Sequence, residues 1–420
     1  MDRLRIAMVG TRGVPARYGG FETAVEEVGR RLADRGHDVV VYCRTAPDAA
    51  GPRPAEHLGM RLVHLPAARR RALETLSHTA LSVQHLLTHR TDVALVFNAA
   101  NAPLLPLLRA ARIPVATHVD GLEWKRAKWG PAGRRYYRAA EALAVRWSDV
   151  LIADAQGIAD YYRDAFAAPT TLLTYGAPRI RPGAHRLAEV GLEPRGYHLV
   201  VARFEPENHV DLVVEGYVAG AATRPLVVVG SAPYSDAYTR RVHALADDRV
   251  RFLGGVWDQE LLDQLYAHAC TYLHGHSVGG TNPSLLRAIG AGAAVTAFDV
   301  DFNREVVGES GRWFRTPADV ARATEAAEAD PAGTLRAGER ARERAAAYDW
   351  DEVAAGYEEL AARLAGRRFP RRRPSGRRRP TAADDLPPPP PPPPPAAGPA
   401  ADVPAPAPAP EAERLPAGQP

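Results

Sequence analysis

The sequence predicts an α/β protein with two parallel β-sheets, and three observations lead to this prediction. Apolar runs of strand length alternate with helical segments, which is typical of parallel sheets covered by helices on both faces. The runs fall into two series, separated over about residues 177–195 by a segment rich in Pro, Gly and Arg. A chain of 420 residues is also longer than a domain with a single hydrophobic core usually is. We therefore expect two doubly wound domains, over residues 1–180 and 195–348, that face each other across a cleft.

The first series opens with the most informative stretch of the chain. Residues 6–9 are predicted to form a buried strand, which Gly10 and Gly13 end, and the pair Gly19-Gly20 opens an amphipathic helix. The free backbone N–H groups at the start of such a helix suit an anion. The glycine spacing fits neither the dinucleotide fingerprint nor a Walker loop. A plain Gly-rich turn of an α/β protein is the alternative.

The other predicted strands complete the two series. They are residues 37–43, 92–97, 114–118 and 149–153 in the first series, and 199–202, 226–229, 250–253, 271–274 and 294–297 in the second. Ligands of doubly wound folds bind at the carboxyl ends of the strands. We therefore expect the chemistry in the loops that follow Val9, His118, Ala202 and His276.

A second glycine motif follows the strand at 271–274. Gly279 and Gly280 permit close approach of a ligand to the backbone, and the helix that comes next favours negative charge at its start. Thr281 or Asn282 is a suitable N-cap, and Pro283 suits the first helical turn. The pattern predicts a diphosphate site, with a purely structural capped loop as the alternative.

The chain changes character after residue 366. Residues 367–420 hold 19 of the 38 prolines, and their nine Arg and five acidic residues give a net charge of +4. The whole chain is also +4, so residues 1–366 sum to zero and the basic character is no sign of a nucleic-acid partner. We expect a disordered Arg/Pro-rich tail that builds no core. Its Arg cluster would suit an anionic membrane surface, and a merely solubilising tail is the alternative.

Cysteine content and hydropathy narrow the class of protein. The chain has two cysteines, Cys43 and Cys270, which excludes a disulfide framework and a cysteine-based zinc site. The sequence contains no apolar run of about 18 residues or more, the length needed to span a bilayer. The first residues also lack the apolar stretch of a signal peptide. We therefore expect a cytoplasmic protein.

Three longer motifs sharpen this interpretation. They are GTRGVPARYGGFET at residues 10–23, VDGLEWKRAKWG at 119–130 and HGHSVGGTNPSLL at 274–286. In this order they resemble motifs of the bacterial rhamnosyltransferase-like branch of the retaining family-4 glycosyltransferases, which have the GT-B fold. The resemblance implies that a helix over about residues 349–366 crosses back onto the first domain. It also implies a nucleotide-sugar donor bound by Gly19, Gly20, Gly279, Gly280, Thr281 and Asn282.

Two positions depart from the pattern of the wider family. Arg203 matches an arginine that faces the donor diphosphate, but Asn208 stands where the family usually has a lysine. Arg287 stands where the family has a glutamate that contacts the nucleotide ribose. We expect Arg203, Asn208 and Arg287 at the donor site, with Arg287 replacing the cation lost at Asn208. Drift in a weakened copy of the enzyme is the alternative.

The chain's two lysines, Lys125 and Lys128, lie between Trp124 and Trp129. An ammonium group is not interchangeable with a guanidinium, and flanking tryptophans favour contact with an interface, a lipid-linked acceptor or a sugar ring. We predict an acceptor or membrane loop here, with a solvated basic loop as the alternative.

The candidate catalytic residues are Asp120, His118 and Arg203. Asp120 and His118 follow a first-domain strand and could contact the donor sugar or the acceptor hydroxyl, although either could instead be structural. Arg203 would stabilise the departing diphosphate. No D-x-D-like pair lies at a strand end and the histidines lack ligand spacing, so we expect neither a metal nor another cofactor.

These expectations define a leading function and two alternatives. The leading function is a cytoplasmic, peripherally membrane-associated glycosyltransferase that moves a sugar with retention. Its expected donor is dTDP-L-rhamnose, and its expected acceptor is a lipid-linked glycan or a polysaccharide. One alternative is a GT-B sugar-nucleotide epimerase, which would need no acceptor. The other is a catalytically weakened GT-B scaffold whose proline-rich tail recruits partners.

Overall fold

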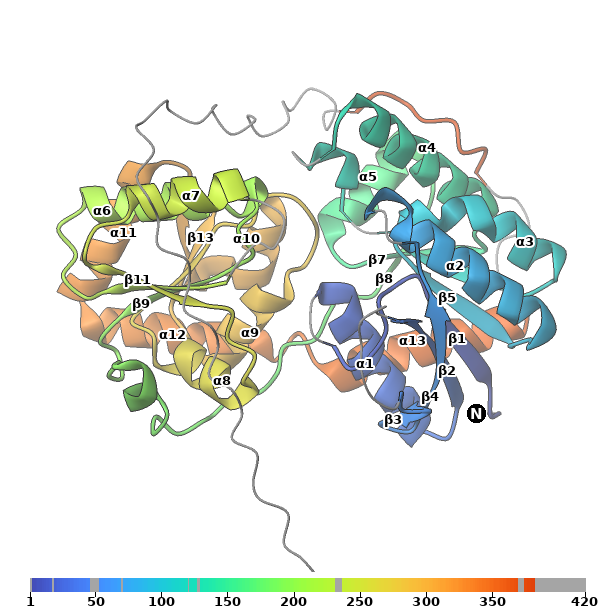
Figure 1. Ribbon diagram of the computed structural model, residues 1–420, viewed down its shortest axis with the longest axis horizontal. Helices are drawn as coiled ribbons and strands as arrows, with labels where there is room; N and C mark the ends of the chain where they lie inside the picture. Colours follow the sequence, from blue (N-terminus) through green and yellow to red (C-terminus); the bar gives the residue numbers. More distant parts are fainter. Residues whose placement is uncertain are drawn as a thin grey trace, which may run out of the picture.

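The computed structural model describes residues 2–16, 19–45, 53–68, 71–119, 121–126, 129–230, 236–368 and 374–381. They form two α/β domains that lie next to each other (Figure 1). Each domain has one β-sheet with helices packed on both faces. The prediction of two doubly wound, Rossmann-like domains is confirmed.

The first domain has an eight-stranded sheet in the order β3-β4-β2-β1-β5-β6-β7-β8, parallel except for the β3–β4 pair. Side chains alternate between its faces, since Ile6 and Met8 of β1 join one core cluster and Ala7 and Val9 join the other. The strands are β1 (Arg5–Val9), β2 (Asp38–Thr45), β3 (Glu56–His57), β4 (Met60–Pro66), β5 (Val93–Phe97), β6 (Val115–Val119), β7 (Val150–Ala153) and β8 (Thr171–Leu172).

Helices cover both faces of this sheet. Buried residues of α1 join the cluster of Ile6 and Met8, and those of α2, α4 and α5 join the cluster of Ala7 and Val9. The helices are α1 (Gly20–Asp34), α2 (Arg71–Thr88), α3 (Leu105–Ala110), α4 (Pro131–Trp147) and α5 (Gln156–Phe166), with the 3₁₀ turns η1 (Ala99–Leu104) and η2 (Glu123–Lys125).

The second domain has a six-stranded parallel sheet in the order β11-β10-β9-β12-β13-β14. Its strands are β9 (His198–Val201), β10 (Leu226–Val229), β11 (Val250–Gly254), β12 (Tyr272–His274), β13 (Val295–Phe298) and β14 (Arg312–Phe314). Its helices are α6 (Val210–Ala219), α7 (Asp236–Leu245), α8 (Gln259–His268), α9 (Pro283–Ala291), α10 (Asp301–Val307), α11 (Pro317–Ala329) and α12 (Pro331–Ala345), with the 3₁₀ turns η3 (Leu187–Val190), η4 (Pro206–Asn208) and η5 (Gly308–Ser310). The strand order reverses beside β1 in the first sheet and beside β9 in the second, and ligands of such sheets bind beyond these switch points.

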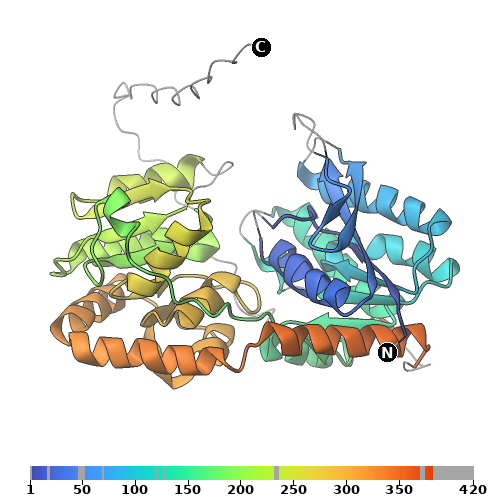
Figure 2. The ribbon, with the colours of Figure 1, turned by 90° about the horizontal axis from the view of Figure 1, so that it is seen from below.

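The last helix, α13 (Trp350–Ala365), belongs to the second half of the sequence but packs against α1 of the first domain (Figure 2). Glu358 on this helix accepts a hydrogen bond from Arg35 Nη1 at 2.9 Å, and its other oxygen lies 3.0 Å from His37 Nε2. Asp351 accepts from Arg31 Nε at 2.6 Å. These contacts attach the end of the second domain to the first.

The tail departs from the prediction of disorder in one segment. Residues 374–381 lie along α4 and α5 of the first domain. The Arg379 N–H donates to Ala165 O of α5 at 2.7 Å, Arg378 Nε donates to Tyr161 Oη of α5 at 3.2 Å, and Gly376 lies against Ala142 of α4. The prediction for residues 369–373 and 382–420 lies outside the described residues. Among the helices of the described ranges, none is both long and apolar enough to cross a membrane.

Glu328 holds three parts of the second domain together. Its carboxylate accepts hydrogen bonds from the backbone N–H groups of Thr223 and Arg224 at 2.9–3.0 Å, and it lies 3.0 Å from Nε2 of the buried His198 on β9. Burial alone would raise the pKa of Glu328, but the hydrogen bonds from His198, Thr223 and Arg224 outweigh it and lower the pKa to about 2.

We predict that Glu328→Gln destabilises the fold at pH 7 by about 1–3 kcal/mol, since hydrogen bonds to a charged group are lost. The carboxylate's folded-state pKa lies below its ordinary value of 4.5, so its stabilisation is present above that pH and is lost as the pH falls towards 2. Urea unfolding at pH 7, 5 and 4 should show the difference from the native chain shrinking. The exposed Glu339→Gln on α12 is the matched control and should leave stability unchanged. A constant difference across this pH range would contradict the prediction.

Candidate functional site

A cleft of about 1850 Å³ lies between the two domains, at the carboxyl ends of the central strands of both sheets. The predicted site residues that line it are Gly19, Gly20, Trp129, Arg203, Asn208, Gly279, Gly280, Thr281, Asn282 and Arg287. The cleft lining does not include His118, Trp124 or Lys125, of which the first two are buried and Lys125 is half-buried. Asp120 and Lys128 lie outside the described residues.

The loops after β9 and β12 form the second-domain wall and are bound tightly to each other. The amide of Asn208 donates from Nδ2 to Arg203 O at 2.8 Å, which leaves Oδ1 as the acceptor for His276 Nδ1 at 2.8 Å. Ser277 N donates to Glu207 O at 2.9 Å. Asn208 therefore works as a clamp between the loops, and its amide is engaged in this structure by protein groups.

The second glycine motif follows the predicted local structure at the start of α9. Asn282 is the N-cap, with its side chain accepting from Ser284 N at 2.9 Å, and Pro283 occupies the first turn. Thr281, the other predicted cap, instead donates its hydroxyl to Asp154 O at 2.6 Å, across the boundary between the domains. The sequence alone left these two candidates open, and tertiary contact decides between them.

The glycines of this motif bring the two domains into direct contact. A Cβ atom on Gly280 would overlap the carboxylate of Asp154, and one on Gly121 would overlap the backbone of Gly279. Asp154 follows β7 and is buried. The glycines predicted to allow the approach of a ligand thus also allow the close approach of the first domain, and their contact with a ligand stays a prediction.

The first glycine loop is closed onto the helix that follows it. The backbone N–H groups of Arg12 and Ala16 donate to the carboxylates of Glu22 and Glu26 on α1, at 3.0 and 2.8 Å. These two N–H groups of the loop are therefore engaged by α1, and they are distinct from the N–H groups at the start of the helix that the sequence predicts to suit an anion. The start of α1 has Gly19 as N-cap without a side-chain cap, and a Cβ on Gly20 would lie 3.2 Å from the Pro283 ring of α9. The N-termini of α1 and α9 thus meet across the cleft.

His118 on β6 is enclosed by aromatic rings. Phe97 and Tyr175 stack on it at centroid distances of 5.6 and 5.9 Å, and Phe21 meets it edge-on at 5.1 Å. Burial lowers the pKa of His118 to about 3, so the ring is neutral, and neither nitrogen has a hydrogen-bond partner within the described ranges. Phe21 and Tyr175 line the cleft in front of it. Contact between His118 and a substrate would therefore require these rings to move.

An ion pair across the domain boundary was missed by the sequence analysis. Arg126 Nη1 lies 3.4 Å from Glu207 Oε1, and Arg126 Nε lies 2.6 Å from Glu123 Oε2. Trp129 Nε1 donates to the other oxygen of Glu123 at 3.2 Å. Glu207 is only 1% exposed, so this cation lies beside a buried carboxylate of the second domain. The i,i+3 spacing of Glu123 and Arg126 was the available signal, but nothing local indicated Glu207.

The two tryptophans of the acceptor loop have different environments. Trp124 is only 5% exposed, with the Arg138 guanidinium 4.2 Å from its ring centroid, so in this structure its ring is not presented to an interface or a sugar. Its ring packs beside α4. Trp129 is half-buried and lines the cleft, and Lys125 lies 5.5 Å from the Trp124 ring centroid. The exposed Trp257, which also lines the cleft, was not predicted.

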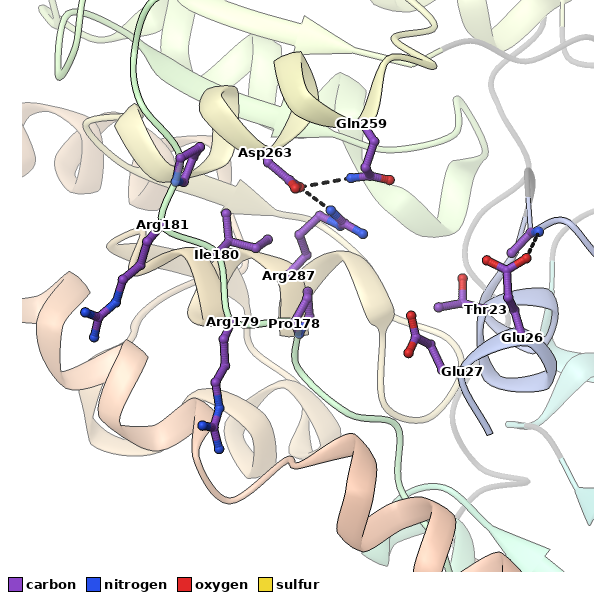
Figure 3. Close-up of a pocket in the computed structure, with 12 residues that line it drawn as sticks. Thr23, Glu26, Glu27, Pro178, Arg179, Ile180, Arg181, Gln259, Asp263 and Arg287 are labelled. Carbon is purple, nitrogen blue, oxygen red and sulfur yellow. Dashed lines mark hydrogen bonds and ion pairs between the residues drawn. The ribbon is translucent and has the colours of Figure 1, made fainter. Parts of the chain in front are cut away.

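Arg287 has a partner that the sequence did not reveal. Its guanidinium forms an ion pair with Asp263 of α8, and Gln259 Nε2 donates to the same Asp263 oxygen at 2.9 Å (Figure 3). Arg287 lines both the large cleft and an adjoining pocket of about 560 Å³, whose opposite side carries Thr23, Glu26 and Glu27 of α1. A diphosphate would have to share this guanidinium with Asp263 or displace it.

Metal binding has no clear candidate site in the described ranges. No group of three or more His, Cys, Asp or Glu side chains there is arranged to hold a metal ion. Metal independence stays a prediction.

We predict that Gly280→Ala prevents full domain closure, because the added methyl group would overlap the Asp154 carboxylate. Small-angle X-ray scattering should report a larger radius of gyration, while circular dichroism stays unchanged. Gly157→Ala on α5 is the matched control, since a Cβ there would meet no atom within 4 Å. Identical scattering profiles for native chain and Gly280→Ala would show that the contact does not hold the domains together.

Comparisons with known structures agree with this architecture. Sucrose-phosphate synthase (tll1590) from Thermosynechococcus elongatus superposes with a TM-score of 0.76 at 22% identity, over 87% of this chain and 100% of that one. Anabaena Alr3699/HepE in complex with UDP-glucose gives 0.70 at 17% identity, over 86% and 100%. WaaG, a glycosyltransferase involved in lipopolysaccharide biosynthesis, gives 0.63 at 18% identity, over 86% and 100%. No curated protein sequence matches significantly.

Family models identify the two domains. Residues 19–176 match the glycosyl transferase 4-like domain, and residues 195–330 match the glycosyl transferases group 1 domain. The matched ranges contain the loops at the switch points of both sheets, with one exception. The first glycine loop, which follows β1, lies before residue 19 and is outside them. The chain is therefore a glycosyltransferase of the GT-B type, with a glycosyl transferase 4-like domain followed by a glycosyl transferases group 1 domain.

Proposed function

We propose that this glycosyltransferase moves a sugar from a nucleoside diphosphate to a lipid-linked glycan or a polysaccharide, with retention of the anomeric configuration. L-Rhamnose, carried by dTDP, is the first donor to test because of the motif resemblance. The observation that supports the proposal best is the cleft itself. Two helix N-termini meet there beside Arg203, which is a favourable environment for a diphosphate. HepE, a similar structure, is described in complex with UDP-glucose.

The donor would lie mainly on the second domain. Its diphosphate leaves with developing negative charge, and helix dipoles and a guanidinium stabilise such charge without any reorganisation. Arg203 and the start of α9 supply these groups on one wall, and the start of α1 faces them. Because Asn282 already caps Ser284 N and Pro283 has no N–H, the loop at Gly279, Gly280 and Thr281 would supply part of the backbone contact.

The acceptor would enter along the first domain. Trp129, Tyr136 and Tyr137 line that wall, and rings of this kind pack against sugars while a polar group binds hydroxyls. Glu123, which lines the same wall, accepts from Trp129 and pairs with Arg126. Retention would follow if the leaving diphosphate itself takes the proton of the acceptor hydroxyl, as the resemblance implies. Asp120 remains a proposed contact of the reacting groups.

We also propose that the enzyme works in the cytoplasm at the inner face of the membrane. A lipid-linked acceptor would be presented there, and the arginines of residues 367–379 would be attracted to anionic headgroups. Cosedimentation of the full chain with anionic and with neutral vesicles tests this directly. Equal sedimentation with both would exclude electrostatic recruitment.

The decisive experiment is a thermal-shift panel of nucleotide sugars, followed by transfer assays with the donors that bind. A donor at a hundred times its Kd should stabilise the fold by about 2.7 kcal/mol, an easily measured shift. Transfer to an acceptor, with retained configuration by NMR, is the expected result. Epimerised nucleotide sugar formed without acceptor would instead identify an epimerase. No donor binding at all would favour the non-catalytic scaffold.

We predict that Arg203→Ala weakens donor binding about ten- to a hundredfold, the worth of a charge-assisted hydrogen bond to phosphate. Calorimetry with the donor found in the panel measures this change. Arg322→Ala on α11 is the control, since this exposed arginine pairs with Asp319 and does not line the cleft. Unchanged donor affinity in Arg203→Ala would show that Arg203 does not bind the diphosphate.

A double-mutant cycle tests whether Arg287 also binds the diphosphate. The pair with Asp263 is 24% and 23% exposed, and such a pair is worth about 0–1 kcal/mol, less than the about 1.5–3 kcal/mol of a phosphate contact. Asp263→Asn should then strengthen donor binding slightly, and Arg287→Ala should weaken it about tenfold in either background. If Arg287→Ala weakens binding only when Asp263 is intact, the arginine serves to neutralise Asp263.

A further inference from the structure

The segment at residues 374–381, which we call the strap, has a defined seat on the first domain. It lies beside α4 and α5, where it appears as an orange-red trace (Figure 1). The Arg379 N–H donates to Ala165 O in the last turn of α5 at 2.7 Å. Gly376 has a φ of +73°, and a Cβ there would lie 2.6 Å from Ala142 O of α4. A side chain at residue 376 would therefore push the strap off α4.

Arg378 inserts from the strap into the first domain. Its Nε donates to Tyr161 Oη at 3.2 Å, and its guanidinium carbon lies 5.8 Å from the Tyr161 ring centroid and 5.6 Å from that of Trp124. A guanidinium at such distances attracts the faces of aromatic rings. Its neighbour Arg377 is exposed, and its backbone N–H donates to Ser375 Oγ at 3.2 Å. Two adjacent arginines therefore have different environments.

A buried carboxylate also attracts Arg378 to this position. Glu141 of α4 is 4% exposed, and its Oε2 accepts from Tyr161 Oη at 2.9 Å. Burial raises the pKa of Glu141 to about 7, and the charges of Arg378 and Arg138 act in the opposite direction. Loss of Arg378 would leave this carboxylate with less compensating charge.

The ring of Trp124 links the strap to the cleft. Trp124 belongs to the 3₁₀ turn η2, in which the N–H groups of Lys125 and Arg126 donate to Leu122 O and Glu123 O at 2.8 and 3.1 Å. Glu123 and Arg126 face the cleft, and Arg126 reaches Glu207 of the second domain. Two contacts thus connect the strap to the domain boundary. Arg378 lies against the ring of Trp124, and Arg126 of the same turn pairs with Glu207.

We propose that the strap is a positioning element, which holds the Trp124 turn in place and so shapes the acceptor wall of the cleft from behind. The arginines of the tail then have two separate uses: Arg378 binds the protein's own first domain, while exposed ones such as Arg377 remain available to solvent or an anionic surface. The part of this proposal that concerns the acceptor rests on the proposed function. The part that concerns the turn does not.

Hydrogen–deuterium exchange on full-length variants tests the turn directly. Arg378→Ala should speed exchange of the Lys125 and Arg126 amides about tenfold, since the ring loses a cation and the nearby carboxylate loses compensating charge. Gly376→Val removes no charge but should displace the strap and give the same increase. Arg377→Ala is the matched control and should exchange like the native chain. Native exchange in both Arg378→Ala and Gly376→Val would overturn the proposal.

A kinetic measurement then separates positioning from general destabilisation. Once the thermal-shift panel and the transfer assays have given a donor and an acceptor, Arg378→Ala should raise the KM for acceptor several-fold and leave donor affinity unchanged. Equal loss of acceptor and donor affinity would mean a global effect and would contradict a role specific to this wall. If no donor is ever found, the proposed function fails, while the exchange experiment still decides whether the strap holds the turn.

Discussion

The backbone contact between the glycine motif of the second domain and the strand ends of the first controls the shape of the site. Gly279 lies against Gly121 and Gly280 against Asp154, so closely that a methyl group would not fit at either place. Such contact requires a residue without a side chain at positions 121 and 280, and it brings the carboxyl ends of two sheets into one cleft. The meeting of the N-termini of α1 and α9, the ion pair of Arg126 with Glu207 and the two walls of the cleft all depend on this approach.

Much of the fold could be predicted because its signals are local. The central strands are apolar runs that the core buries completely, and the cap at Asn282 follows from the residue types around Pro283. The strand at Met60–Pro66 was missed because it lies near the edge of the sheet, and its burial varies along its length. Its sequence therefore lacks the apolar run by which the central strands were recognised.

The errors at the candidate site have a different origin, since they concern partners that are distant in sequence. Trp124 could be given an exposed role because nothing near it in the chain announces Arg138 on α4 or Arg378 in the tail. Likewise, Asp263 precedes Arg287 by 24 residues and meets it only because α8 packs beside α9. The residue types and their spacing indicate what a segment itself can form. They do not reveal which charges of other elements the fold places against that segment.

The charges around Arg203 show how the diphosphate would have to be held. A pattern with two cations after β9 is replaced here by Arg203 and by Asn208, whose amide is engaged with Arg203 O and His276. The neighbouring Glu207 is buried, and Arg126 offsets its charge, so that this second guanidinium is not spare for phosphate while the pair stands. The loop after β9 therefore carries one cation fewer than a two-cation pattern, and Arg287 on α9 is the proposed replacement. In the proposed donor complex, backbone dipoles would supply part of the stabilisation, and they would do so only when the N-termini of α1 and α9 face each other. Under the proposed function, domain closure and binding of the leaving group would therefore be one requirement, so the contact at Gly280 would matter for chemistry as well as for shape.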